Sequence, residues 1–430
     1  MPGRYNLMEM YKEGRLDEVT TIWENEQETA QFDEWSFIAV MNCFYSLKRY
    51  DKCVAVYRDF HKAFPDSDKL DDKLGWSLYQ TSIKNFDFKS GNVTNLCKQV
   101  IYILQHSTSS EYSPKWCVVK FMLNAMERGN LCLEQGYLLA DRYLDYIDPN
   151  TLSTVENLIQ LQNGESRRLA SDRETWYSEK SKVLLKLQKY EECIQCCDAA
   201  LRGLYSFHSN NDSWFRYRKA QCLYALGRAE EAKACIQKIL EAGFSHWCLL
   251  QLMFELERDA GNTDKAMSYA GACATADSSH EMRVSFYPEL ADFLDANGKN
   301  TEAMLHRRLV VLLREENGWG RKAYQDSWQF TPEIAAMDKE AILKKLIPFW
   351  RELRDKDKEY LTGTVERIFV EGHSGLILAE DGQLYYFNTR DIHGKNHNVK
   401  KGMKMRFTLV DRLDKSKGIV KKNAVEISII

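Results

Sequence analysis

The 430-residue sequence is poor in residues that interrupt helices, with only seven prolines and 22 glycines. It also lacks any apolar run approaching the roughly 18 residues that a membrane-spanning helix needs. The first residues, Met1 to Tyr5, lead into no apolar stretch of the length that a secretory signal requires. We therefore expect a mainly helical protein of the cytoplasm, without a membrane segment.

Paired metal-ligand motifs are missing as well. The twelve cysteines are scattered singly along helical patterns, except for Cys193, Cys196 and Cys197. These three fall within one helical stretch, and no second Cys or His pair follows at zinc-finger spacing. Packing of free thiols in a reducing cytoplasm is the favoured interpretation, and a metal site is the alternative. We expect no metal and no cofactor.

Catalytic motifs are not evident either. His280-Glu281 lacks the second histidine of a zinc-protease helix, and Gly298-Lys299 has no upstream glycine to form a phosphate-binding loop. The segment Gly372–Gly375 is too short for a nucleophile elbow. We expect no enzyme activity and no small-molecule substrate. The alternative is that polar groups from distant segments converge in a pocket.

What the sequence does hold is a recurring segment that combines a helix stop, a tight turn and a helix start. It is clearest at Leu226–Lys233, and it ends on a small or slender residue such as Ala232. The same pattern returns at residues 14–19, 49–53, 189–193, 261–266 and 298–303. Ala232 and Ala266 lie about 34 residues apart, the period of a helix-hairpin repeat.

Over residues 1–315 the sequence therefore resembles the tetratricopeptide-repeat (TPR) family. One helix hairpin cannot bury its apolar stripe alone, so the resemblance implies an α-solenoid of stacked hairpins. The pattern is weak at about 68–165, where we expect irregular units. Residues 316–358 are predicted to be a connector and a capping helix, with Ile342, Leu346 and Trp350 on one apolar stripe.

From Leu361 the pattern changes to short strands of period two, and five of them fit within residues 361–430. Thr362–Val365, Gly375–Ile377, Tyr386–Ile392 and Val399–Phe407 together resemble the cold-shock domain family. Barrels of the ribosomal S-one type are the nearest alternative. The predicted fold is mainly α, with a TPR-like solenoid followed by a small five-stranded β-barrel of the OB type.

The cold-shock resemblance implies that single-stranded nucleic acid stacks on outward aromatic side chains. The family's first-strand tryptophan position holds Arg367 here, and its second-strand aromatic positions hold Ser374 and Leu376. Much of the stacking platform is thus missing. Tyr386 is the remaining third-strand aromatic, or Tyr385 if the register slips. The nucleic-acid-binding candidates are Arg367, His373, Tyr386, Asn388, Arg390, Lys395, Lys400, Lys401 and Lys404. The alternative is that the lysines only keep a structural barrel soluble.

Repeat position also predicts which side chains line the inner face of the helical array. These candidates for partner binding are Trp35, Asn42, Tyr45, Lys182, Trp214, Tyr217, Gln221, Tyr224, Gln251 and Arg258. Aromatic and amide groups with few like charges suit a peptide or protein segment. The alternative is that the aromatic residues pack between neighbouring units.

Together these features predict a cytoplasmic, non-catalytic adaptor or regulatory protein. The array would hold a protein partner, and the barrel would contact single-stranded RNA or DNA. The alternative is a protein-only scaffold or inhibitor whose barrel is structural or binds protein.

Overall fold

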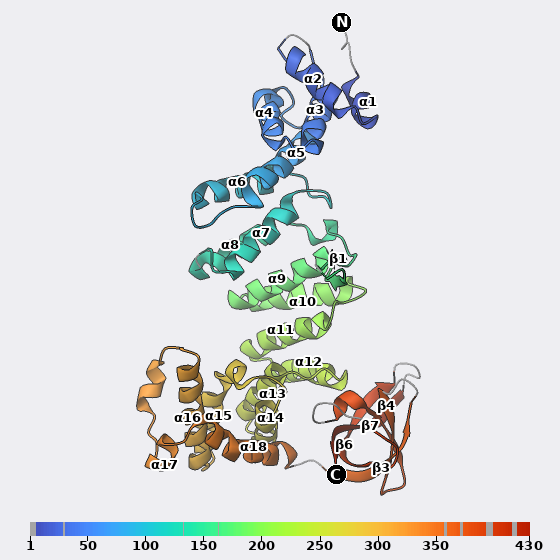
Figure 1. The fold of residues 1–430 in the computed structure, drawn as a ribbon. Helices are drawn as coiled ribbons and strands as arrows, with labels where there is room; N and C mark the ends of the chain where they lie inside the picture. Colours follow the sequence, from blue (N-terminus) through green and yellow to red (C-terminus); the bar gives the residue numbers. More distant parts are fainter. Residues whose placement is uncertain are drawn as a thin grey trace. The chain divides into compact units, whose positions relative to one another are not determined.

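The computed structural model describes residues 6–28, 31–131, 133–161, 163–356, 359–369, 373–392, 399–414 and 419–430. The chain divides into two compact units, Met1–Arg218 and Lys219–Ile430. The predicted fold class is confirmed: stacked helix hairpins make up most of the chain, and a closed five-stranded barrel follows them (Figure 1). The division at residue 315 stays a prediction.

The first unit is built from helix hairpins and one strand pair. Its elements are α1 (Leu7–Lys12), α2 (Leu16–Glu26), α3 (Glu34–Ser46), α4 (Tyr50–Phe60), α5 (Asp68–Leu78), α6 (Val93–His106), α7 (Lys115–Glu127), α8 (Leu133–Asp145), β1 (Asn157–Gln160), β2 (Ser166–Leu169), α9 (Asp172–Lys186) and α10 (Tyr190–Gly203). Helix α11 (Asn211–Ala225) begins in this unit and ends in the second.

The second unit contains the remaining helices and the barrel. Its elements are α12 (Ala229–Glu241), α13 (Trp247–Asp259), α14 (Thr263–Ala274), α15 (Phe286–Ala296), α16 (Asn300–Glu316), α17 (Pro332–Ala335), α18 (Lys339–Asp355), β3 (Leu361–Ile368), β4 (Ser374–Ala379), β5 (Leu384–Asn388), β6 (Lys404–Asp414) and β7 (Ile419–Ile429).

The recurring segments of the sequence share one turn geometry. In each, a residue with positive φ ends the first helix, and the next amide donates to the carbonyl five residues earlier, at 2.8–3.0 Å. The residues with positive φ are Gly14, Lys48, Gln188, Gly227, Gly261 and Gly298. Such a turn satisfies a carbonyl at the helix end and favours glycine, although Lys48 and Gln188 adopt it too.

The small residue that closes each segment is buried, as the repeat pattern predicts. Cys53, Cys193, Ala232, Ala266 and Ala303 have no exposed surface. A larger side chain at these points would hold neighbouring helices apart, which explains why the sequence keeps them small.

The region of weak repeat pattern, residues 68–165, holds a turn of the same kind that the sequence did not reveal. Gly129 has positive φ, and the amide of Asn130 donates to the carbonyl of Ala125 at 3.0 Å. Helix α8 begins at Leu133, four residues after this glycine, whereas α12 begins at Ala229, two residues after Gly227. The longer turn displaces the helix pattern and hides the repeat.

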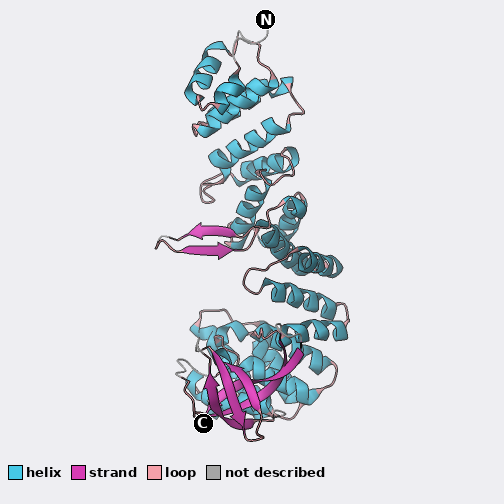
Figure 2. Ribbon diagram, turned by 90° about the vertical axis from the view of Figure 1, so that its right-hand side faces the viewer, coloured by secondary structure: helices cyan, strands magenta, loops and turns pink. Residues whose placement is uncertain are grey.

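The strand pair β1–β2 was not predicted. The two strands pair antiparallel with Ile159 opposite Arg167, and Leu161 accepts the amide of Gly164, which has positive φ. Gly164 makes the tight turn that a hairpin needs. Both strands are largely exposed, and Figure 2 shows them extending from the neighbouring helices.

Helix α18 packs against α14 and α16 in the second unit. Its Trp350 is fully buried, stacks on Tyr287 with ring centroids 5.8 Å apart, and donates its indole N–H to Nε2 of His306 at 2.8 Å. A Cβ on Gly271 of α14 would lie 2.5 Å from the backbone of Trp350 and Arg354. Glycine at this point therefore permits the two helices to touch.

The five strands close in the order β3-β4-β5-β7-β6, with β5 and β7 parallel and the other neighbouring pairs antiparallel. Alternate side chains fill the barrel, among them Val365, Ile377, Phe387 and Phe407, all without exposed surface. Gly375 leaves room for Phe387, because a Cβ there would lie 2.6 Å from its ring.

Candidate functional site

The outer face of strands β3, β4 and β5 carries the best-placed nucleic-acid candidates. Arg367 lies opposite Leu376, and Leu376 lies opposite Tyr386, so the three form one row across the strands. Arg367 is exposed, and 38% of Tyr386 is accessible to solvent. Tyr385 points inward and donates its hydroxyl to Asp381 at 2.7 Å. The register is therefore the one that places Tyr386 outside.

Phe369 completes this row and was missed from the sequence. Its ring stacks on that of Tyr386 with centroids 6.3 Å apart, and the Arg367 guanidinium lies 5.8 Å from its centre. The available signal was strand alternation, since Phe369 follows Arg367 by two residues and faces the same side. We call Arg367, Phe369, Leu376 and Tyr386 the outer aromatic cluster.

The other barrel candidates lie at varying distances from this cluster. Lys404 is exposed and pairs with Thr364 on the neighbouring strand, and Lys400 is exposed before it. Lys401 forms an ion pair with Glu366 at 2.8 Å, so the carboxylate partly neutralises its positive charge. Asn388 lies opposite Ser374 at the end of the strands, and the carbonyl of exposed His373 accepts the Thr389 amide. Lys395 and the side chain of Arg390 lie outside the described residues.

Exposed aliphatic side chains adjoin the cluster on the outer face of the barrel. Leu378 and Leu384 lie opposite each other in the row that includes Thr364, and both are exposed. Such residues contact either the flat faces of bases or an apolar patch on a protein. This row is the observation that keeps the protein-binding alternative open.

On the array, the predicted partner residues of the first unit already have contacts within the chain. Lys69 lies 4.0 Å from the centre of the Trp35 ring, and Lys73 lies 4.6 Å from that of Tyr45. Asn42, which lies between Trp35 and Tyr45 in the sequence, is half-buried. Lys182 forms an ion pair with Glu179 at 2.7 Å. The rings of Trp35 and Tyr45 thus make cation–π contacts with lysines of α5.

Helix α11 places Trp214, Tyr217, Gln221 and Tyr224 at helical spacing on one face. Trp214 and Tyr217 are half-buried, and their ring centroids are 5.8 Å apart. The hydroxyl of Tyr224 donates to the carboxylate of Asp259 on α13. The aromatic residues of α11 therefore pack within the chain and also keep accessible surface, and their role in partner binding stays a prediction.

The inner helices of the second unit carry negative charge. Gln251 donates to Glu255 at 2.9 Å, and Arg258 pairs with Asp259 at 2.8 Å. Burial raises the pKa of Glu289, and the negative charge of Glu255 raises it further. The negative charge of α13 thus acts on a carboxylate of α15 that is far away in sequence. The expectation of few like charges among the predicted partner residues stays a prediction.

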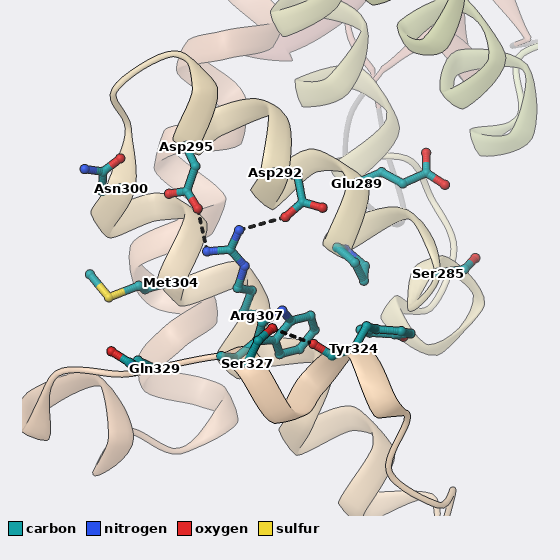
Figure 3. A pocket seen from close by; sticks show the side chains of 12 residues that line it. Ser285, Glu289, Asp292, Asp295, Asn300, Met304, Arg307, Tyr324, Ser327 and Gln329 are labelled. Carbon is teal, nitrogen blue, oxygen red and sulfur yellow. Dashed lines mark hydrogen bonds and ion pairs between the residues drawn. The ribbon is translucent and has the colours of Figure 1, made fainter.

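A cavity of about 840 Å³ lies beside α15, α16 and the following connector (Figure 3). Arg307 binds Asp292 at 2.7 Å and Asp295 at 2.5 Å across one wall. Its lining residues are Ser285, Pro288, Glu289, Asp292, Asp295, Asn300, Met304, Arg307, Tyr324, Ser327, Trp328 and Gln329. This cavity was not predictable from the sequence, since the connector residues show no period.

The cysteine cluster consists of thiols packed in the helical core. Cys193 and Cys197 are buried, and burial raises the pKa of Cys196 to about 12, so its thiolate is disfavoured at neutral pH. Among the described residues, no group of three or more His, Cys, Asp or Glu side chains is arranged to hold a metal ion. None of the described helices combines the length and apolar character needed to cross a membrane.

One domain-family model matches part of the chain. Residues 213–348 match a domain family described as a domain of unknown function, DUF7017. A comparison with curated proteins returned no match.

This chain is distantly similar to solved structures of helical-repeat proteins. A human IFIT1 dimer with PPP-AAAA is 12% identical, with a TM-score of 0.35 over 81% of this chain and 73% of that one. PilF of Pseudomonas aeruginosa is 13% identical, with a TM-score of 0.28 over 60% of this chain and 92% of that one. A Rap protein complexed with competence and sporulation factor is 12% identical, with a TM-score of 0.29 over 82% and 97%. Likeness at this level transfers no function to this chain.

Proposed function

We propose that this protein is a non-catalytic adaptor that binds a protein partner through its helical array and single-stranded RNA or DNA through its barrel. The outer aromatic cluster carries the nucleic-acid part of this proposal. Tyr386 and Phe369 offer stacked rings at the surface, and Arg367 adds a guanidinium that stacks on bases and attracts phosphate. A closed five-stranded barrel is the architecture that OB-type proteins use for such contacts.

Two modest contacts on one chain would act together, because the bound partner and the bound strand hold each other at high local concentration. The inner residues of α11 and α13 support the protein part. Trp214 and Tyr217 of the first unit supply partly exposed aromatic surface, and Gln251 and Arg258 of the second unit supply polar groups. Aromatic surface flanked by polar groups is typical of protein interfaces.

The test is fluorescence anisotropy with short labelled single strands of RNA and DNA and the full chain, at low and moderate salt. We expect binding that weakens as salt rises, because bound phosphates release counterions. Replacing both rings in F369A/Y386A should weaken it at least about tenfold, since one stacked base contributes about 1–3 kcal/mol. The matched control is Y205A, which removes a fully exposed tyrosine outside the barrel.

Lack of binding by the wild-type chain at low salt would rule out the nucleic-acid part. The second candidate function, a protein-only scaffold or inhibitor, would then remain, and the exposed pair Leu378 and Leu384 favours it. Equal weakening by Y205A would show that the binding does not use the outer aromatic cluster.

A further inference from the structure

The cavity beside α15 and α16 has walls of two chemical kinds. Glu289, Asp292 and Asp295 bring carboxylates to it from α15. Tyr324 and Trp328 bring aromatic rings from the connector, with centroids 5.4 Å apart. Aromatic faces next to carboxylates are the combination that proteins use to bind ammonium and guanidinium groups.

Elsewhere in the described part of the chain, three aromatic rings lie against the chain's own cations. Lys69 covers Trp35, Lys73 covers Tyr45, and the Arg406 guanidinium lies 4.0 Å from the centre of Tyr360. In the described part of the chain, no lysine or arginine lies over Tyr324 or Trp328, although 48% of Tyr324 is accessible. The rings of Tyr324 and Trp328 can therefore bind a cation of a partner, as the rings of Trp35 and Tyr45 bind lysines of α5.

The charge of the cavity favours a cation. Its lining contains three carboxylates and one guanidinium, and Arg307 is engaged by Asp292 and Asp295. Glu289 has no hydrogen-bond or ion-pair partner among the described residues. Figure 3 shows Glu289 apart from the group that Arg307 forms with Asp292 and Asp295. The excess of carboxylates over guanidinium groups in the lining attracts a cation and disfavours an acidic ligand.

The size of the cavity favours a protein segment over a small free cation as its ligand. One lysine or arginine side chain fills only part of about 840 Å³, so the neighbouring backbone of an extended segment also has room. Polar groups such as Asn300, Ser327 and Gln329 line the remainder and can bond to that backbone.

We propose that this cavity, here called the cation pocket (Glu289, Asp292, Tyr324 and Trp328), binds a lysine or arginine side chain of an extended segment in a protein partner. The proposal rests on the proposed function in one respect, namely that the helical array binds protein. It adds the chemistry of the partner, which presents a basic residue.

The test uses the full chain labelled with 5-fluorotryptophan, in which the W328F variant assigns the fluorine resonance of Trp328. The probes are the N-acetyl methylamides of lysine, arginine and norleucine, at equal ionic strength. We expect lysine and arginine amides to shift the Trp328 resonance with dissociation constants on the order of millimolar, and norleucine amide to leave it unmoved.

Variants of the pocket sharpen the test. E289Q and Y324A should each weaken binding of the lysine amide by about five- to tenfold, because each removes one attraction for the cation. The matched controls are E340Q, an exposed carboxylate on α18, and Y205A, an exposed tyrosine outside the pocket; both should bind as the wild type does. Circular dichroism melting confirms that each variant is folded.

An unmoved Trp328 resonance with both basic amides, or an equal shift with norleucine amide, would overturn the proposal. So would equal weakening by E289Q and E340Q, since the effect would then be that of general charge. The anisotropy experiment, through the comparison with F369A/Y386A, reports on the nucleic-acid part of the proposed function. Failure of nucleic-acid binding and failure of the cation pocket are therefore distinguishable.

Discussion

At position 306 a histidine is completely buried, and both nitrogens of its ring have partners. Nδ1 lies 2.6 Å from the carbonyl of Glu302, to which it donates, and Nε2 accepts the indole N–H of Trp350 at 2.8 Å. Accepting at Nε2 requires the neutral ring. Burial lowers the pKa of His306 from 6.5 to about 4, and the nearby positive charge of Arg307 lowers it too.

This histidine predicts a loss of stability in mild acid. Above pH 6.5 the ring is neutral in both the folded and the unfolded chain, so the full stability is present. Between pH 6.5 and about 4 the unfolded chain binds a proton that the folded chain does not. The free energy of unfolding should therefore fall by up to about 3 kcal/mol from this group. Urea unfolding of the second unit at a series of pH values measures it.

The variant H306Q keeps a hydrogen-bond acceptor for Trp350 but does not titrate. It should show a shallower loss of stability over the same pH range, even where its stability at pH 7 is lower. H373Q, which changes an exposed histidine, should follow the wild type. Identical slopes for H306Q and the wild type would show that His306 is not responsible.

At the scale of the element, helix packing depends on how closely two backbones approach. Gly271 of α14 lies against the backbone of α18, where a Cβ would come within 2.5 Å of the Trp350 carbonyl oxygen and the Arg354 nitrogen. Backbone atoms cannot move aside as a flexible side chain can. A methyl group at position 271 must therefore displace the helix.

G271A should destabilise the second unit by about 1–3 kcal/mol, the usual cost of overpacking. The matched control is G136A in α8, where a Cβ meets no atom within 4 Å. That change should stabilise the chain by up to about 1 kcal/mol, because alanine favours helix. Urea midpoints of the two variants measure both effects. A neutral G271A would mean that α18 shifts at little cost.

At the scale of the whole molecule, the chain forms two compact units, Met1–Arg218 and Lys219–Ile430. Helix hairpins contact mainly their neighbours, so the stability of such an array is built from local interfaces. The two units are therefore expected to unfold separately, and each would respond to changes within its own core.

Differential scanning calorimetry should show this as two overlapping transitions, with a calorimetric enthalpy larger than the van't Hoff enthalpy. G271A should lower the midpoint of one transition and leave the other in place. A single transition with equal enthalpies would indicate that the units unfold together.

Local chemistry explains which parts of the fold were predictable. The turn segments appear in the sequence because the residue with positive φ and the buried small residue, such as Gly227 and Ala232, are close along the chain. The barrel was predictable because Val365, Ile377 and Phe387 alternate with outward residues along short strands. The turn at Gly129 and the β1–β2 hairpin were missed, since a longer turn and an exposed strand pair break both periods.

The sequence by itself determined the class of fold, the turns between helices and the strands of the barrel, because each depends on residues a few positions apart. Only the tertiary structure decided which surfaces form. It brought Phe369 against Tyr386 across two strands, and it placed Tyr324 and Trp328 of an irregular connector beside the carboxylates of α15. These contacts join residues of separate segments, so packing rather than a pattern along one segment establishes them.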